Sequence, residues 1–490
     1  MAAWAGFVLP DLSGLADGVT PEPLPPRALD AVYHDTADLR LSRWGVSLRF
    51  RSGDGAGWTV KLPEGDDGPA LVRREVPFPG GPGAPPEGAL DLVRAYARSA
   101  PLLAAARIRT KRQGVALKDE EGHRLAEVVS DEVTVLDGRR VAARFREVEV
   151  EVDARAPAGL LTVVVHRLRA AGAGAPDPTS KVVRALGARA MAPPEVVPAP
   201  LGHDPTGGQV VRNAIAASVI RILVHDAGVR LGDDAEDVHQ ARVGTRRLRS
   251  DLRTFRPLLV EEWAEPLREE LSWLADALGA VRDADVLTER LRRQAALLPE
   301  VDAASFAPVL RRLADEREVA RAALAQTMAS DRYVALLDRL VLAANAPLLA
   351  PEADKHADDA VPALVARPWK KLRNAVRALP AEPADEELHE VRILSKRARY
   401  AAEAAVPAAG KPARRFAEAV AGVQGVLGDH NDASVAEEWL RRHATGSDVT
   451  QALALGELVG VQRAEAALCR QAWRKAWRKA DRKWLRTWLS

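Results

Sequence analysis

The chain of 490 residues has a single cysteine, Cys469, and only 4% aromatic residues. One cysteine excludes an intramolecular disulfide and a cysteine-based metal site, and it suits a reducing compartment. No apolar run approaches the ~18 residues of a membrane span, and no basic segment precedes an apolar stretch at the N-terminus. We therefore expect a cytoplasmic protein without a membrane partner. The sequence also lacks P-loop, GxSxG and HExxH patterns, and with them the chemistries that those motifs mark.

The chain has little net charge, because its 70 basic and 68 acidic residues leave a formal charge of +2. Any binding of a polyanion must therefore come from local segregation of charge. The length predicts two or three domains. Residues 192–208 hold five prolines and three glycines without apolar periodicity, which predicts a linker between a domain at 1–191 and a domain at 209–490.

In the first domain, apolar and charged residues alternate along several segments, which predicts β-strands. Residues 159–171 and 180–190 are predicted to form short helices. In RFREVEVEV (144–152) valines alternate with Glu147, Glu149 and Glu151, and in GVSLRFR (45–51) apolar residues alternate with Arg49 and Arg51. Charged residues on one face of several strands are typical of a solvent-exposed face. Their recurrence across several strands also allows a second option, a closed sheet whose polar interior holds phosphates and a divalent metal.

Several segments of this domain resemble the CYTH, or triphosphate tunnel, family: FVLPDLSGL, YHDTADLRLSRWGVSLRFRSG, GWTVKLPEG, the R-x-R-x-K run, LAEVVSDEVTVLDG, FREVEVEV and SKVVRALG. The resemblance implies an antiparallel β tunnel in an α+β chain, with Mg or Mn as the metal. The implied triphosphate clamp comprises Arg49, Arg51, Lys61, Arg109, Lys111 and Lys181. The implied metal-side residues are Glu149, Glu151, Glu147 and Glu127. Catalytic residues are unknown.

The family opens with a strand carrying E-x-E-x-K, whereas this chain begins at MAAWAGF, after the place of that strand. Either the recorded start lies too late or the strand is missing. In the second case we expect a tunnel without one wall, an exposed sheet edge, and anion binding that survives without turnover.

The rest of the chain is predicted to be helical and contains two copies of one basic helix. His239, Arg242, Arg246 and Arg249 lie at offsets 0, 3, 7 and 10, and their side chains share one stripe of a helix. The second copy has His389, Arg392, Lys396 and Arg399 at the same offsets, and Arg247 and Arg397 match at offset 8. Arg253 extends the first row, but its counterpart in the second row is Glu403.

A second repeated motif follows each basic helix. LGAVRDADV, from Leu278, matches LGDHNDASV, from Leu427, at a displacement one residue shorter than that of the histidines. Two motifs displaced by nearly one period predict an internal duplication, with halves at about 209–345 and 352–490. The two copies resemble the CHAD family, which implies two four-helix halves and an association with inorganic polyphosphate.

Three functions fit these residues. The favoured one is a polyphosphate-binding helical domain joined to a CYTH domain that binds triphosphate and has a metal-dependent triphosphatase activity. The binding residues would be His239, Arg242, Arg246, Arg247, Arg249, His389, Arg392, Lys396, Arg397 and Arg399. Nucleic acid is the second partner, disfavoured because the basic stripes carry no aromatic stacking platform. In the third, the stripes pair with acidic helices in a purely structural role. A phosphate-binding scaffold without catalysis is a further alternative to the favoured function. The sequence sets no oligomeric state.

Overall fold

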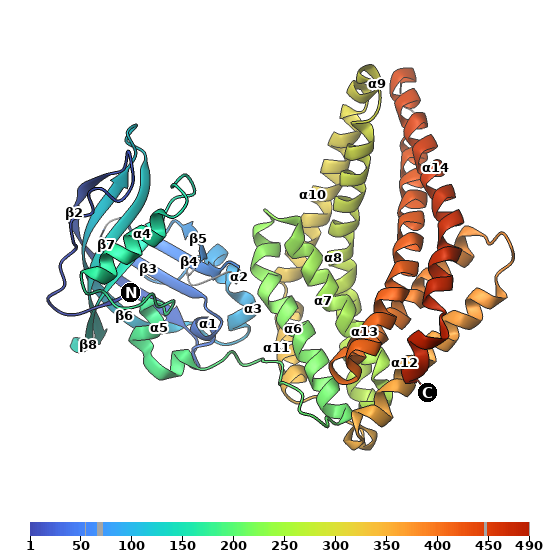
Figure 1. The fold of residues 1–490 in the computed structure, drawn as a ribbon, viewed down its shortest axis with the longest axis horizontal. Coiled ribbons are helices and arrows are strands. Elements are labelled where there is room, and N and C mark those ends of the chain that lie inside the picture. Colours follow the sequence, from blue (N-terminus) through green and yellow to red (C-terminus); the bar gives the residue numbers. More distant parts are fainter. Residues whose placement is uncertain (54, 66–71, 445–447, 490) are drawn as a thin grey trace. The chain divides into compact units, whose positions relative to one another are not determined.

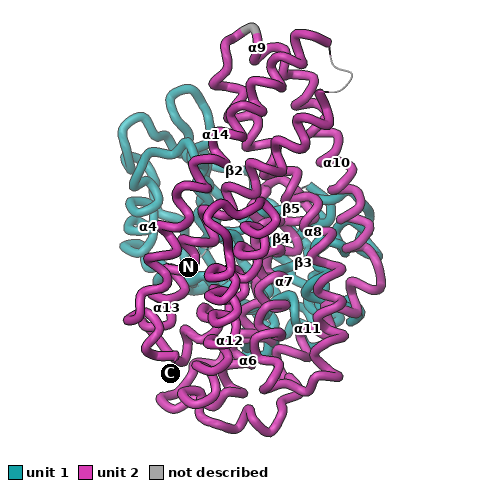
Figure 2. The backbone as a smooth tube through the Cα atoms, turned by 90° about the vertical axis from the view of Figure 1, so that its right-hand side faces the viewer, with its two compact units in different colours: residues 1–195 teal, residues 196–490 magenta. Residues whose placement is uncertain are grey.

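The computed structural model describes residues 1–53, 55–65, 72–444 and 448–489 and divides into two compact units. Unit 1 spans Met1–Glu195 and unit 2 spans Val196–Ser490 (Figure 2). The division falls inside the proline-rich segment 192–208. Glu195 belongs to unit 1, because its carboxylate accepts hydrogen bonds from Arg98 at 2.7 Å and from the indole of Trp44 at 2.9 Å.

Unit 1 is built on one antiparallel sheet of eight strands. Their order is β1-β8-β7-β6-β2-β3-β4-β5, and the two end strands are not paired with each other over the described residues. The strands are β1 (Ala2–Ala3), β2 (Thr20–Asp35), β3 (Ser47–Ser52), β4 (Gly57–Pro63), β5 (Arg73–Phe78), β6 (Leu103–Lys118), β7 (Arg124–Asp137) and β8 (Arg140–Val152). The expected antiparallel β domain is therefore confirmed, with a linear strand order.

The apolar face of this sheet is covered by helix α4 (Leu160–Ala170), as Figure 1 shows. Leu117, Val128 and Val148 from three neighbouring strands pack with Leu160 and Val164 of α4 in one buried cluster. Each strand alternates, so the residues next to these valines point to the opposite face. Burial of the valines thus fixes the side on which Glu147 and Glu149 lie, as the alternation predicted.

Helix α5 (Lys181–Leu186) packs against the opposite, polar face of the sheet. Its Val182 is buried with Tyr33 of β2, Ile108 of β6 and Val133 of β7. This small apolar cluster places the first residue of α5, Lys181, over the charged part of the face. The other short elements of unit 1 are α1 (Arg40–Arg43), α2 (Glu87–Leu92), α3 (Arg94–Ala97) and η1 (Gly187–Met191).

All regular elements of unit 2 over its described residues are helices. Its elements are α6 (Gly207–Leu231), α7 (Ala235–Thr254), η2 (Arg256–Leu258), α8 (Glu261–Ala295), α9 (Glu300–Ser305), α10 (Ala307–Ala329), α11 (Asp331–Asn345), η3 (Pro351–Asp354), α12 (Ala357–Ala378), α13 (Asp385–Ala444), α14 (Val449–Ala480) and η4 (Lys483–Leu489). In Figure 1, α10 and α14 belong to the two long arms of this unit.

The helix ends follow from local sequence. Thr206 and Gln209 form a reciprocal capping box at the start of α6, and Gly232 ends the same helix in the left-handed region at φ 73°. Asp234 caps α7 by accepting a hydrogen bond from the backbone of Glu236. Helix α13 is broken at Gly410, whose φ of 61° and ψ of −136° only glycine adopts readily. Its two segments therefore correspond to α7 and α8.

A reciprocal contact relates the two halves of unit 2. Thr206 and His356, the N-cap residues of α6 and α12, form an antiparallel bridge. The Gly207 amide donates to the Lys355 carbonyl at 2.9 Å, and the Ala357 amide donates to the Pro205 carbonyl at 2.8 Å. Gly207 and Ala357 are separated in sequence by the same number of residues as His239 and His389, and so are Pro205 and Lys355. Each of the two hydrogen bonds is therefore the counterpart of the other in the repeat. An approximate two-fold axis therefore passes through this bridge.

The tryptophans of the C-terminal segment lie in different settings. Trp473 is buried, and Trp477 stacks on Trp369 of α12 with ring centroids 5.3 Å apart. Trp484 is exposed. Among the described residues, no helix is long and apolar enough to cross a bilayer.

Candidate functional site

Three carboxylates from neighbouring strands meet on the polar face of unit 1. Asp131 of β7 stands opposite Glu147 of β8 in the register, and Glu149 follows one step along the same face. Their carboxylate oxygens lie within 4.8 Å of one another. We call Asp131, Glu147 and Glu149 the carboxylate triad. Asp131 is fully buried, so the triad needs positive charge beside it to stay ionised.

Lys181 supplies that charge. Its ammonium lies 2.5 Å from Asp131, 2.9 Å from Glu147 and 2.8 Å from Glu149. Burial works against an ammonium here, but Glu149, Asp131 and Glu147 outweigh it and raise the pKa of Lys181. Arg112 of β6 adds a bidentate bond to Asp131, at 2.7 and 2.8 Å, and a bond to Glu149 at 2.9 Å.

A basic cluster occupies the other end of the same face. The basic cluster comprises Arg49 of β3, Lys61 of β4 and Arg73 of β5. Among the described residues of these strands one carboxylate, Glu75, accompanies it and pairs with Lys61. Arg49 donates to the Tyr33 hydroxyl at 3.3 Å, and its Nε has no hydrogen-bond partner among the described residues. Burial, then the charge of Arg49, lower the pKa of Lys61. The cluster thus has excess positive charge in a poorly hydrated place, which favours an anion.

The triad and the basic cluster act on each other across the curled sheet. Burial opposes ionisation of Glu149, but Lys181, Arg112 and Lys61 hold its pKa at about 2. Four strands separate β4 from β8 in the sheet order, so Lys61 can influence Glu149 only if the sheet curls and brings the two sides together. The polar face is therefore an interior, acidic on one side and basic on the other.

Two predicted clamp residues, Arg109 and Lys111, lie on the face of the sheet opposite to the triad. Ile108 and Thr110 of β6 are buried on the interior face, so Arg109 and Lys111 point the other way and are exposed. Arg109 pairs there with Asp30 at 2.9 Å. The residue of β6 that reaches the triad is Arg112. The sequence could have indicated this, because Arg112 and the apolar Ile108 are an even number of residues apart on one strand and so point to the same face.

The predicted metal-side glutamates divide into two groups. Glu147 and Glu149 belong to the triad, whereas Glu151 is exposed and Glu127 pairs with Arg27 at 3.2 Å and Arg124 at 2.6 Å. Asp131 completes the triad and was not predicted, because LAEVVSDEVTVLD gives no sign of its register with β8.

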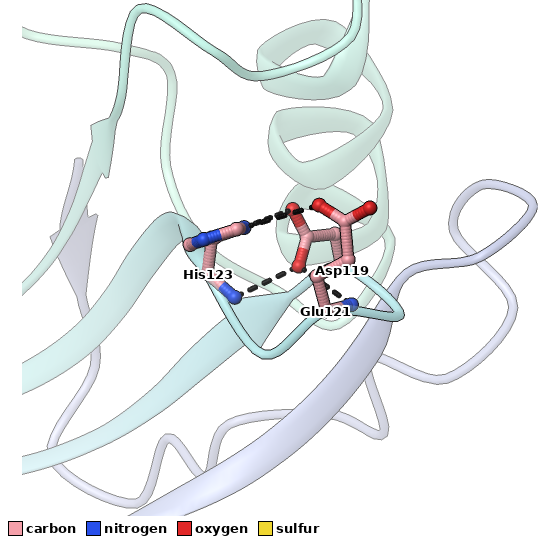
Figure 3. A group of neighbouring side chains, drawn as sticks. All are labelled: Asp119, Glu121 and His123. Carbon is pink, nitrogen blue, oxygen red and sulfur yellow. Dashed lines mark hydrogen bonds and ion pairs between the residues drawn. The ribbon is translucent and has the colours of Figure 1, made fainter.

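A second acidic group, Asp119, Glu121 and His123, lies in the turn between β6 and β7 (Figure 3). Asp119 accepts hydrogen bonds from the backbone amides of Glu121 at 3.0 Å and His123 at 2.8 Å. The His123 ring lies 3.2 Å from the second oxygen of Asp119. Both oxygens of Asp119 are therefore engaged in closing the turn.

The triad fits a hard divalent cation, because its donors are carboxylate oxygens close enough to share one ion. Such an ion would compete with the Lys181 ammonium, which already contacts all three carboxylates. Acidic groups able to hold a metal are thus present, and CYTH domains generally use divalent metals.

In unit 2, the two basic helices bring their histidine-proximal residues together. We call His239, Arg242, Arg246, His389, Arg392 and Lys396 the central cluster. Arg242 pairs with Asp283 of α8 at 2.7 Å, and Arg392 faces Asp432 in the second segment of α13 at 3.9 Å. Asp283 and Asp432 belong to the repeated LGxxxD motifs. Each motif therefore supplies one acid beside the arginine three residues after its histidine.

Two acids leave the central cluster strongly positive. Burial and the guanidiniums of Arg392, Arg246 and Arg242 lower the pKa of Lys396 to about 8. Arg246 and Lys396 have no ion pair among the described residues, and the Arg246 guanidinium lies 5.5 Å from the centre of the Tyr400 ring. Tyr400 is buried beneath Arg246 and Arg399, so it lies under the arginine face rather than away from it.

The two histidines of the central cluster differ. His239 is half-buried, and burial, then the charge of Arg282, lower its pKa. His389 is exposed and its Nδ1 lies 2.7 Å from the side-chain oxygen of Asn431. Arg282 and Asn431 stand at equivalent positions of the two LGxxxD motifs, so each histidine neighbours the same position of the repeat, occupied by a different residue type.

The chain matches known proteins over both units. The CYTH domain model matches residues 9–186, and the CHAD domain model matches residues 213–441. An uncharacterized protein of Mycobacterium tuberculosis, Rv2226, is 33% identical over 470 residues, which cover 90% of this chain and 87% of that protein.

Two solved structures resemble part of the chain. PptA from Streptomyces chartreusis shares 28% identity over 56% of this chain and 99% of its own, with a TM-score of 0.48. The CHAD domain from the plant Ricinus communis shares 28% identity over 57% of this chain and 94% of its own, with a TM-score of 0.46. On the two domain models and the relative matched over most of both lengths, the chain belongs to the family of proteins in which a CYTH domain precedes a CHAD domain.

Proposed function

We propose that unit 2 binds inorganic polyphosphate through the central cluster. The observation that carries this proposal is the crowding of Arg242, Arg246, Arg392 and Lys396, whose only ion-pair partners among the described residues are Asp283 and Asp432. Mutually repelling cations hold together more favourably when a polyanion lies among them. Polyphosphate offers one charge per unit at regular spacing, and arginine binds each phosphate in bidentate geometry.

The surroundings favour polyphosphate over the alternatives. A purely structural role would leave the basic rows neutralised, but Arg246, Arg249, Lys396 and Arg397 have no ion pair among the described residues. Nucleic acid binding would use exposed aromatic rings beside the arginines, whereas Tyr400 is covered by two guanidiniums. The cluster therefore offers cations for phosphate groups but no exposed ring for a nucleic acid base, which fits a ligand made of phosphates alone.

Competition separates polyphosphate from nucleic acid. The full chain is titrated with fluorescent long-chain polyphosphate, then with unlabelled polyphosphate or single-stranded RNA at equal phosphate concentration and fixed salt. We expect polyphosphate to displace the probe at a concentration at least tenfold lower than RNA. Equal or better displacement by RNA would contradict the proposal.

We propose that the interior of unit 1 binds triphosphate together with a divalent cation, and that this site hydrolyses the triphosphate. Arg49, Lys61 and Arg73 would bind the phosphates, and Asp131, Glu147 and Glu149 would hold magnesium or manganese. The ion, when bound, neutralises charge on phosphate oxygens. Lys181 contacts all three carboxylates and would move to the phosphates as the cation takes its place.

Phosphate release tests this second proposal. Wild-type chain is assayed with inorganic triphosphate and Mg²⁺ or Mn²⁺, beside Glu149→Gln and, as a matched control, Glu151→Gln on the same strand. We expect release by wild type and Glu151→Gln and a loss of at least a hundredfold in Glu149→Gln. Absence of release with either metal would refute hydrolysis, while triphosphate binding measured by calorimetry would still test the phosphate site.

A further inference from the structure

The two basic rows differ in charge at one position, and that position lies beyond the central cluster. Arg247 and Arg249 of α7 correspond to Arg397 and Arg399 of α13 in the repeat. The next member of the first row is Arg253, whereas the second row has Glu403 at the equivalent position. The approximate two-fold axis therefore relates two small clusters of opposite character, each built from both helices.

The first of these clusters is the Glu403 site, which comprises Arg247, Arg399 and Glu403. The Glu403 carboxylate lies 3.3 Å from Arg247 and 2.7 Å from Arg399. Its side chain is 20% exposed and those of both arginines are 32% exposed, so all three are partly shielded from water. A carboxylate between two guanidiniums occupies the position that arginine pairs commonly offer to a phosphate.

A cavity of about 410 Å³ adjoins the Glu403 site. Its lining comprises three arginines, two carboxylates and four apolar residues: Arg247, Arg399, Arg414, Glu403, Glu418, Val406, Pro407, Ala417 and Ala421. The space beside Glu403 is therefore large enough for the carboxylate to turn aside and for a phosphate group to enter. In the structure the carboxylate stays with its arginines.

The second cluster is the Arg253 site, which comprises Arg249, Arg253 and Arg397. Partial loss of hydration, then the charges of Arg397, Arg268 and Arg249, lower the pKa of Arg253. The nearby Glu265 is engaged by Arg268. No carboxylate pairs with Arg249, Arg253 or Arg397 within the described part of the chain. This cluster is therefore the cationic counterpart of the Glu403 site without an internal anion.

We infer that bound polyphosphate extends from the central cluster onto the Arg253 site and is kept from the equivalent Glu403 site by the carboxylate of Glu403. This inference rests on the proposed polyphosphate binding and adds a direction to it. A phosphate entering the Glu403 site must first break the two charge-assisted bonds of Glu403. A phosphate entering the Arg253 site breaks none and relieves repulsion among three guanidiniums. The duplicated domain thus holds its ligand asymmetrically.

A charge exchange tests this inference on the full chain with long-chain polyphosphate. Arg253→Glu should weaken binding at least tenfold, because it gives the Arg253 site its own carboxylate. Glu403→Arg should strengthen binding, because it frees Arg247 and Arg399. The double variant R253E/E403R moves the open site to the other side of the axis and should bind within about threefold of wild type.

The salt dependence gives a second measurement with smaller changes. Arg253→Gln should lower the slope of log K against log salt by about one, as expected for one lost phosphate contact. Glu403→Gln should raise the same slope by one to two, because two arginines become available. Both substitutions remove a charge without introducing the opposite one, which keeps the test valid where Arg253→Glu fails to fold.

Remote variants control for net charge. Arg442→Glu and Glu438→Arg alter an exposed ion pair near the far end of α13 by the same charges. The inference is overturned where Arg442→Glu weakens binding as much as Arg253→Glu does, or where R253E/E403R stays as weak as Arg253→Glu. Wild-type chain that binds no polyphosphate would instead refute the proposed function. If the wild-type chain binds polyphosphate and substitution of Arg253 leaves the affinity unchanged, the asymmetry is refuted and the proposed function stands.

Discussion

Polyphosphate binding should weaken as the pH rises from 7 to 9, because Lys396 loses its proton in this range. The pKa of Lys396 in the free protein is about 8, against an ordinary value of 10.5. Lys396 is protonated in about nine-tenths of the molecules at pH 7 and in about one-tenth of them at pH 9. A polyanion beside Lys396 favours the ammonium and raises its pKa again.

The size of the effect follows from proton linkage. With a pKa of about 8 in the free protein and about 10.5 or more in the complex, the affinity falls roughly tenfold between pH 7 and pH 9. This corresponds to about 1.4 kcal/mol of binding free energy. The sign is fixed, because the complex holds the proton more tightly than the free protein does.

Lys396→Arg provides the matched comparison, since arginine stays charged throughout this range. Binding is measured by fluorescence anisotropy at pH 7.0, 8.0 and 9.0 with constant ionic strength and long-chain polyphosphate. Asp251 also has a pKa of about 8, so Asp251→Asn is included in both backgrounds to remove its contribution. We expect the tenfold decline in wild type and little decline in Lys396→Arg. Equal declines in both proteins would refute the assignment of Lys396 to the binding cluster.

Three further predictions concern buried charges. Burial raises the pKa of Asp251 to about 8, so the stability that its protonated form contributes is present below pH 4 and is lost as the pH rises toward 8. The variant Asp251→Asn should therefore have a free energy of unfolding at pH 7 that is higher by up to about 4 kcal/mol. Urea unfolding at pH 5 and pH 7 measures this difference. Arg112→Gln should destabilise unit 1 by roughly 3 kcal/mol in the same assay, because the fully buried Asp131 loses its bidentate partner, and an unchanged unfolding midpoint would contradict this. Lys181→Met should bind Mn²⁺ at least tenfold more tightly in calorimetry and bind triphosphate more weakly, whereas weaker Mn²⁺ binding would show that Lys181 does not compete with the cation.

The sequence predicts best those features that depend on periodicity. The alternation of valine and glutamate over residues 144–152 places Glu147 and Glu149 on the polar face, because the valines of β8 pack against α4. The fixed spacing after His239 and His389 likewise predicts two equivalent basic helices. In both cases the apolar residues of the same segment determine the orientation of the charged ones.

Features that depend on how distant strands pair could not be predicted from the sequence. Arg109 and Lys111 share a motif with the family clamp, but burial of Ile108 turns them to the exposed face and brings Arg112 inward. Asp131 joins Glu147 only through the register of β7 with β8. Lys181 reaches the triad only because Val182 anchors α5 on the sheet.

The partners of the arginines were also not predictable from spacing alone. Glu403 is four residues from Arg399 and pairs with it as helix geometry suggests, but its second partner, Arg247, comes from the other half of the repeat. The difference between Arg253 and Glu403 is visible in the sequence. Its consequence appears only when α7 and α13 lie together and give each cluster residues from both helices.

Polyphosphate binding by the central cluster is tested most directly by titrating one matched pair of variants. One replaces Arg242, Arg246, Arg392 and Lys396 by Gln. The other replaces four exposed arginines of the same domain, Arg292, Arg441, Arg442 and Arg463, by Gln and so has the same net charge. We predict that the first variant, folded by circular dichroism, loses at least a hundredfold in affinity for long-chain polyphosphate, while the second stays within about fivefold of wild type. Equal affinities in the two variants would contradict the account.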